Sequence, residues 1–184
     1  ALDGIATGEK TIDGVKYYFK ANGVFDESTT ESLRKSGTGA LGNPADLLFF
    51  TKFESGDAAY DQCGGDHGHA CGKYQFDNRY SLQNLLNYCY TANPTFFKDF
   101  EPFLTCSKDS LVNNNKLYKA WHACYAANPQ YFASMQDNFA ADQYYKPVET
   151  ALLARGYNLT LRPYVCRGAV FSYSIQDGQT VAVN

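Results

Sequence analysis

The spacing of hydrophobic and polar positions changes near Ser28. Before it, short β-prone runs flank Asp13-Gly14, a dipeptide typical of a two-residue hairpin turn, and Asn22-Gly23 gives a second turn signal. After it, apolar residues recur at the spacing of an amphipathic helix. The pattern predicts an N-terminal β-hairpin over residues 1–26 and a mainly α domain over residues 27–184.

The first predicted helix of the α domain ends at an acidic residue. Asn43 is a suitable N-cap, Pro44 suits the first helical position, and apolar residues repeat on one face up to Phe53, directly before Glu54. Residues 57–77 are rich in glycine and have no helical period, which predicts a loop or small hairpin. Further helices are predicted over residues 79–92, 95–104, 110–127, 130–145, 147–155 and 164–177.

Two segments of the helical region repeat one another. Residues 89–97 and 124–132 share a Cys-Tyr start and a central Asn-Pro. Because the residue before proline disfavours helical geometry, each Asn-Pro predicts a corner where one helix ends and another begins.

Composition excludes several classes of function. The net charge is -3 and no basic stripe is present, which counts against a nucleic-acid partner. Hydrophobic residues make up 45% of the chain, but no run approaches the ~20 apolar residues of a membrane span. We expect a globular monomer that neither enters a membrane nor binds nucleic acid.

The six cysteines leave three interpretations open. An even number is compatible with disulfides, and Cys63 and Cys71 are the best pair because the glycine-rich residues between them can bend back. Six free thiols are the alternative. Zinc held by Cys63, His67, His69 and Cys71 is the third, although their spacing matches no familiar zinc motif. We expect no metal or other cofactor.

Glu54 has the setting of a general acid. It ends an apolar helix opposite a glycine-rich segment, where partial burial would keep the carboxyl protonated and a cleft would expose it. Glycines in the facing segment would let a polymer backbone approach, and the Gln75 amide could hydrogen-bond an acetamido group.

The motif around these residues resembles a known family. Glu54-Ser55, followed by Gly65-Asp66-x-Gly68-x-x-x-Gly72-x-x-Gln75-x-Asp77, is similar to goose-type lysozyme and to the related bacterial lytic transglycosylases. Lys73-Tyr74 departs from the two apolar residues usual in that family. The resemblance implies a lysozyme-like helical domain with a small β-hairpin at its active-site cleft.

The resemblance also implies roles for individual residues. Glu54 would be the catalytic acid, with Asp66 and Asp77 as auxiliary carboxylates. Substrate contacts would come from a larger set: Ser55, Gly72, Tyr74, Gln75 and, as loose counterparts of a later motif, Tyr173 and Gln176. Structural explanations compete with these roles: a solvated helix end for Glu54, a turn for Asp66, an N-cap for Asp77 and a structural hydrogen bond for Gln75.

Residues 8–25 resemble one unit of the cell-wall-binding repeats that recognise choline or glucan. The Asp13-Gly14 turn, the Tyr17-Tyr18-Phe19 strand and Asn22-Gly23 carry the resemblance. Gly8-Glu9 stands where the family has Gly-Trp, and that tryptophan forms part of the ligand cage.

Together these features predict a secreted or phage-delivered muramidase acting on the cell wall outside the cell. It would cleave the β-1,4 bond between N-acetylmuramic acid and N-acetylglucosamine in peptidoglycan glycan strands. Glu54 would protonate the leaving oxygen and Asp66 or Asp77 would activate water with inversion, which requires a wide gap between acid and base. The alternatives are a lytic transglycosylase that forms 1,6-anhydromuramic products, a chitinase-like enzyme, and an inactive wall-binding module.

Overall fold

A computed structural model describes residues 6–12, 15–26, 28–29, 59–159, 162 and 164–183. Over these residues the protein is mainly α-helical with two small antiparallel sheets, which confirms the predicted fold class. They belong to two compact units. The first unit holds the described residues before 51 and after 143, and the second holds residues 59–143.

The first unit begins with the predicted hairpin. Strands β1 (Gly8–Ile12) and β2 (Val15–Phe19) pair antiparallel, with Gly8 opposite Phe19 and Ile12 opposite Val15. The Asp13-Gly14 turn itself lies outside the described residues. At the second predicted turn, Gly23 has a φ of 79° and donates its N–H to the carbonyl of Lys20.

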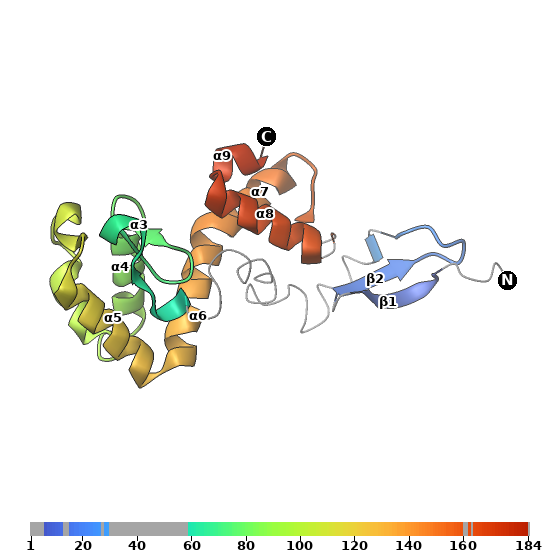
Figure 1. The fold of residues 1–184 in the computed structure, drawn as a ribbon. Helices are drawn as coiled ribbons and strands as arrows, with labels where there is room; N and C mark the ends of the chain where they lie inside the picture. Colours follow the sequence, from blue (N-terminus) through green and yellow to red (C-terminus); the bar gives the residue numbers. More distant parts are fainter. Residues whose placement is uncertain are drawn as a thin grey trace. The chain divides into compact units, whose positions relative to one another are not determined.

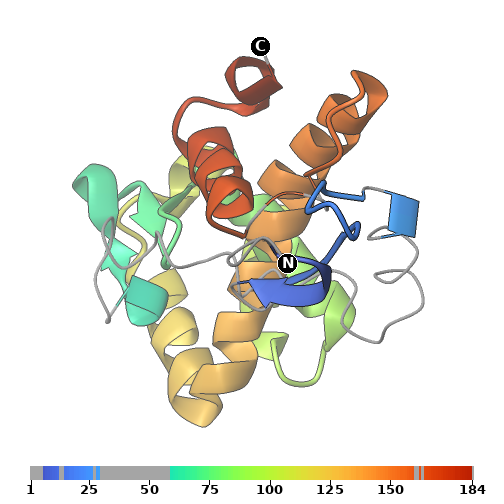
Figure 2. The ribbon, with the colours of Figure 1, turned by 90° about the vertical axis from the view of Figure 1, so that its right-hand side faces the viewer.

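Three helices complete the first unit: α7 (Lys146–Ala154), α8 (Tyr164–Gln176) and α9 (Gln179–Val183). The short α9 packs against both α7 and α8 (Figure 2). The buried Arg167 of α8 donates from Nε to the hydroxyl of Tyr145 at 3.0 Å, and that hydroxyl donates to Glu149 at 2.9 Å. A buried guanidinium is therefore supplied with polar partners.

The second unit opens on a short turn, η2 (Ala59–Asp61), and a three-stranded antiparallel sheet. Its strands are β3 (Cys63–Gly64), β4 (Ala70–Cys71) and β5 (Phe76–Asp77), with β4 in the centre. The helical turn α3 (Gly65–Gly68) connects β3 to β4, and two of its residues are left-handed: Asp66 with a φ of 44° and His67 with a φ of 55°. The sheet leads into α4 (Leu82–Ala92).

Helices α5 (Asn115–Ala127) and α6 (Pro129–Ala140) follow, after two 3-10 turns, η3 (Lys98–Phe103) and η4 (Lys108–Leu111). They meet at a sharp corner (Figure 1). There the Asn128 side chain accepts from the N–H of Tyr131 and so caps α6. A π-helical turn, η5 (Ala141–Tyr145), ends the segment.

Aromatic side chains form the centre of the second unit. Trp121 is fully buried, and its ring centroid lies 4.8 Å from that of Phe132 and 6.3 Å from that of Phe100. The indole N–H donates to the carbonyl of Tyr60 at 2.9 Å. The core of α5 and α6 is thus tied to the segment that precedes the small sheet.

The predicted corners and most predicted helices correspond closely to the structure, but the helix predicted over residues 110–127 begins only at Asn115, after the 3-10 turn η4. Asn93 ends α4 and Asn128 ends α5 through the same bond, an N–H donated to the carbonyl of the cysteine four residues earlier. The predicted helix over residues 95–104 is a 3-10 helix that starts only at Lys98 and contains Pro102. Proline removes a backbone donor, which disfavours a regular α-helix there.

Candidate functional site

The predicted acid and its neighbour, Glu54 and Ser55, lie outside the described residues, and their roles stay predictions. The facing segment is described in full and lies in the three-stranded sheet and the turns that connect its strands. The geometry of the candidate site is therefore that of residues 59–81, together with the helices packed on them.

The two predicted auxiliary carboxylates meet at one arginine. Nη2 of Arg79 lies 2.5 Å from Oδ2 of Asp66 and 2.5 Å from Oδ2 of Asp77. The two carboxylate oxygens are therefore within twice that distance of each other. Residues eleven positions apart converge because β4 and β5 bring the α3 turn back beside the end of the sheet.

Asp77 is held more firmly than Asp66. Its side chain is 16% exposed, against 52% for Asp66, and it also accepts hydrogen bonds from Nε and the backbone N–H of Arg79. Donation from the Arg79 side chain lowers the pKa of Asp77, in opposition to the effect of burial. Asp77 is not the N-cap of α4, which is Ser81, although it closes the turn just before that helix.

The turn from Gly72 to Gln75 faces the interior more than was expected. Gly72 is buried with a φ of 77°, and a Cβ built on it would lie 2.5 Å from Oε1 of Gln136 and 2.8 Å from Trp121. Gln75 is exposed and donates to the Gly72 carbonyl at 2.9 Å, while its Oε1 fills the space beside Gly65. Protein side chains thus occupy the space that these two glycines were expected to leave for a polymer.

Tyr74 is also directed inward. Its side chain is buried, and its hydroxyl donates to Oδ1 of Asp137 at 2.8 Å. Tyr60 donates to the same oxygen at 2.7 Å. The Tyr74 hydroxyl therefore has a hydrogen-bond partner inside the protein, whereas the sequence analysis predicted that Tyr74 contacts substrate.

Asp137 and Arg79 are the principal residues that the sequence analysis missed. Burial raises the pKa of the Asp137 carboxyl, and the two tyrosine donors and Lys73 oppose that rise. Lys73 also places Nζ 4.7 Å from the centre of the Tyr60 ring. Helical spacing gave no signal for Asp137, because it lies two positions from both Met135 and Phe139 and so projects from the opposite side of the helix.

The histidines of the α3 region have different settings. Nδ1 of His69 lies 2.7 Å from Oδ1 of Asn78, whereas His67 is exposed at the left-handed turn. Among the residues that the structure describes, no group of three or more His, Cys, Asp or Glu is placed to hold a metal ion. Cys63, His67, His69 and Cys71 are among these residues, so the zinc alternative gains no support.

Tyr173 and Gln176 lie on α8, in the first unit, whereas the other described candidates lie in the second. Tyr173 is 46% exposed. Their contact with substrate stays a prediction.

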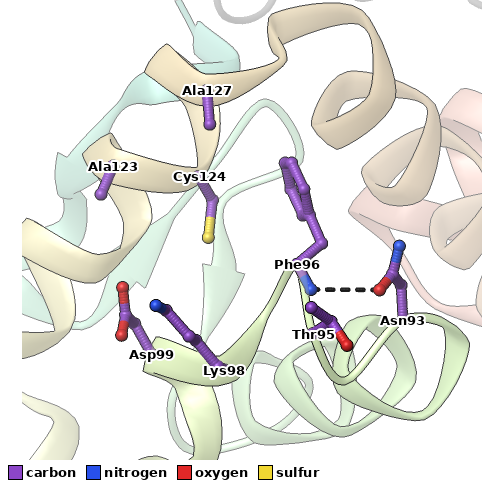
Figure 3. A pocket seen from close by; sticks show the side chains of 8 residues that line it. All are labelled: Asn93, Thr95, Phe96, Lys98, Asp99, Ala123, Cys124 and Ala127. Carbon is purple, nitrogen blue, oxygen red and sulfur yellow. Dashed lines mark hydrogen bonds between the residues drawn. The ribbon is translucent and has the colours of Figure 1, made fainter.

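A pocket of the second unit lies among residues that no prediction singled out. It has a volume of about 510 Å³, and the Cys124 thiol and the side chains of Lys98 and Asp99 line it (Figure 3). Its remaining lining residues come from the end of α4, the following turn and α5: Asn93, Thr95, Phe96, Ala123 and Ala127. None of the predicted catalytic or substrate-binding residues is among them.

Comparisons with known proteins do not assign this site. No protein-family model, curated protein or solved structure matches the chain. Within the described residues, no helix is long and apolar enough to cross a membrane.

Proposed function

We propose that the protein is a muramidase that cleaves the β-1,4 bond between N-acetylmuramic acid and N-acetylglucosamine in cell-wall peptidoglycan. The observation that carries the proposal is the convergence of Asp66 and Asp77 on Arg79 at an exposed edge of the small sheet. These aspartates belong to the motif that resembles goose-type lysozyme, and Glu54 precedes them in that motif.

The geometry supports different roles for the two aspartates. Asp66 is half-exposed and is the carboxylate better able to reach a water molecule, so we assign it the role of orienting or deprotonating the nucleophile. Asp77 accepts hydrogen bonds from three donor groups of Arg79, the backbone N–H, Nε and Nη2, and so fixes the guanidinium that holds Asp66. Glu54 would donate a proton to the leaving oxygen, and hydrolysis would invert the anomeric centre.

The same cluster favours one second candidate. A general base must accept a proton, and the positive guanidinium beside both carboxylates opposes that step. A lytic transglycosylase needs no second carboxylate, because the muramic hydroxyl attacks and closes an anhydro ring. In that reaction Asp66 and Asp77 would serve only to position Arg79 and the turn.

Clearing of purified cell walls tests the proposal. The wild type should lower turbidity, and Glu54→Gln should lose at least about 100-fold in rate because the proton donor is gone. Glu101→Gln, which alters an exposed acid on η3, is the matched control and should clear at the wild-type rate. Equal clearing by wild type and Glu54→Gln, or none by either, would leave at most a wall-binding module.

Asp66→Asn and the reaction products separate the two chemistries. For a hydrolase, Asp66→Asn should lose roughly 100-fold in rate, and mass spectrometry should find reducing-end muramic acid. For a transglycosylase, the variant should retain most activity and the product should be the anhydro form. Anhydro product from the wild type would overturn the assignment of hydrolysis.

A further inference from the structure

Two cysteines lie directly opposite each other in the small sheet. Cys63 of β3 pairs with Cys71 of β4 in the antiparallel register. The N–H of Gly72 donates to the carbonyl of Gln62 at 2.7 Å, which is the bond between the residues immediately outside the pair. That bond identifies Cys63 and Cys71 as a non-hydrogen-bonded pair of the ladder.

This type of pair suits a disulfide. Opposite Cα atoms in a non-hydrogen-bonded antiparallel pair are about 4.5 Å apart, which lies within the range of about 4.4–6.8 Å that disulfides span. The two side chains lie on the same face of the sheet, since directly opposed residues of an antiparallel pair project to the same side. Bridging the two sulfur atoms therefore requires no change of strand register.

We propose that Cys63 and Cys71 form a thiol–disulfide redox site that closes the loop carrying Asp66. The structure holds Cys63 and Cys71 as two thiols on neighbouring strands. The oxidised state would link the two ends of the segment Gly64–Ala70. The inference does not depend on the proposed muramidase activity.

The chemistry is thiol–disulfide exchange with a small disulfide such as glutathione disulfide. The Cys63 thiolate attacks one glutathione sulfur and releases a glutathione thiolate, which forms a mixed disulfide. Cys71 then attacks the Cys63 sulfur and releases the second glutathione. Two protein thiols lose two electrons and two protons, and one glutathione disulfide becomes two glutathione thiols.

Exposure determines the order of the two steps. Cys63 is partly exposed, whereas Cys71 is only 1% exposed. Cys63 is therefore the residue that an external disulfide reaches first, and Cys71 resolves the mixed disulfide. The hydrogen bond to Cys71, together with burial, raises the pKa of the Cys63 thiol. The exchange should accordingly become faster as pH rises above neutrality.

The loop between the cysteines is conformationally demanding. Gly64, Asp66, His67 and Gly68 all have positive φ values, between 44° and 93°. A positive φ is ordinary for glycine, but at Asp66 and His67 it costs conformational free energy that the surrounding structure must offset. A bond between Cys63 and Cys71 would restrict the unfolded loop and so favour this geometry.

Peptide mapping tests the proposal. No lysine or arginine lies between Lys52 and Lys73, so trypsin releases both cysteines on one peptide. After incubation of the whole protein with glutathione disulfide, that peptide should be lighter by two hydrogen atoms and should resist alkylation until it is reduced. The oxidised protein should also melt roughly 5–10 °C higher than the reduced protein.

Matched variants make the result specific. Cys63→Ser and Cys71→Ser should each abolish the thermal shift, whereas Cys106→Ser should retain it because Cys106 lies outside the sheet. The proposal is overturned if the natively folded wild type keeps both thiols alkylatable after oxidation. It is equally overturned if Cys63 carries glutathione as the end product, or if it is joined to a cysteine on another peptide.

Discussion

Two aspartates of the second unit have pKa values shifted in opposite directions. Asp77 is paired with Arg79, which favours the ionised form, whereas burial of Asp137 favours the protonated form. Because a pKa shift on folding makes stability depend on pH, the two residues affect the pH dependence of unfolding with opposite sign.

Asp77 should stabilise the fold at neutral pH. Its lowered folded pKa means that the contribution is present above the unfolded value of about 3.9 and is lost as pH falls through the folded pKa. Asp77→Asn keeps an acceptor for the backbone N–H of Arg79 but loses the charge. Urea denaturation at pH 7 should show a loss of about 0.5–1 kcal/mol, typical of an ion pair in which water still reaches one partner, here the half-exposed Arg79.

Measurements of stability at acidic pH provide the control for the Asp77 prediction. Below about pH 3 the stability difference between wild type and Asp77→Asn should close, while Asp109→Asn, an exposed aspartate on η4, should resemble the wild type throughout. A difference that stays constant with pH would mean that the charge of Asp77 has no part in it.

Asp137 should behave in the opposite way. Its raised folded pKa means that the native state holds the proton longer than the unfolded state, so its contribution falls as pH rises through the folded value. Asp137→Ala should cost about 2–4 kcal/mol, because the hydroxyls of Tyr60 and Tyr74 lose their acceptor.

Asp137→Asn separates the charge from the hydrogen bonds. It retains an acceptor oxygen, so it should recover part of the loss, and its stability relative to wild type should rise as pH increases above the unfolded value of about 3.9. Denaturation curves at several pH values measure both effects. A parallel pH dependence in the two proteins would contradict the raised pKa.

At the residue scale, the sequence pattern indicated the motif but not the residues that form hydrogen bonds and ion pairs with it. Asp66, Asp77 and Gln75 were singled out because they stand at the spacing of a familiar motif, and their roles stay predictions. The shared guanidinium of Arg79 and the acceptor role of Asp137 depend on chain segments brought together by folding, and no local pattern encodes such a meeting. Tyr74 was assigned to substrate, but Asp137, 63 positions later in the chain, is its hydrogen-bond partner.

Elements were easier to predict than residues. The helices α4 to α8 follow apolar periodicity, and Asn128-Pro129 marks a corner through both the N-cap and the fixed φ of proline. The positions of the glycines were equally visible, but the reason for them was not. Gly72 needs its left-handed φ and lies against Gln136 and Trp121, and that contact depends on the packing of α5 and α6 against the turn.

A pair of glycine substitutions separates backbone strain from crowding. Gly72→Ala combines a positive φ with a Cβ pressed against Gln136 and Trp121, so unfolding by urea should show a loss of about 2–4 kcal/mol. Gly64→Ala has nearly the same φ, but its nearest neighbour, the Tyr118 side chain, is 3.7 Å away. Gly64→Ala should lose only about 1 kcal/mol, which is the cost of a positive φ at a residue that has a Cβ atom.

The two glycine variants lie in the same small unit, which makes the comparison direct. Circular dichroism during urea denaturation measures both. Equal losses would show that the core beside Gly72 adjusts to a methyl group, and that the backbone conformation alone requires glycine there.

For the whole molecule, composition and periodicity were sufficient to predict the fold class. A mainly α protein with small hairpins follows from the helical spacing after Ser28 and the turn dipeptides before it. The predicted boundary between residues 26 and 27 stays a prediction. The first unit combines the beginning of the chain with residues after 143. Spacing along the chain carries no information about such a long-range grouping.

The buried indole gives the second unit an optical label of its own. Trp121 is the single tryptophan of the chain, and it lies in a dry aromatic cluster with its N–H donated to Tyr60. Excitation on the red edge, where tyrosine does not absorb, therefore reports on residues 59–143 alone, and its emission should shift to longer wavelength when water reaches the ring. Far-ultraviolet circular dichroism averages over both units. Non-coincidence of the two signals during denaturation would reveal that the units unfold separately.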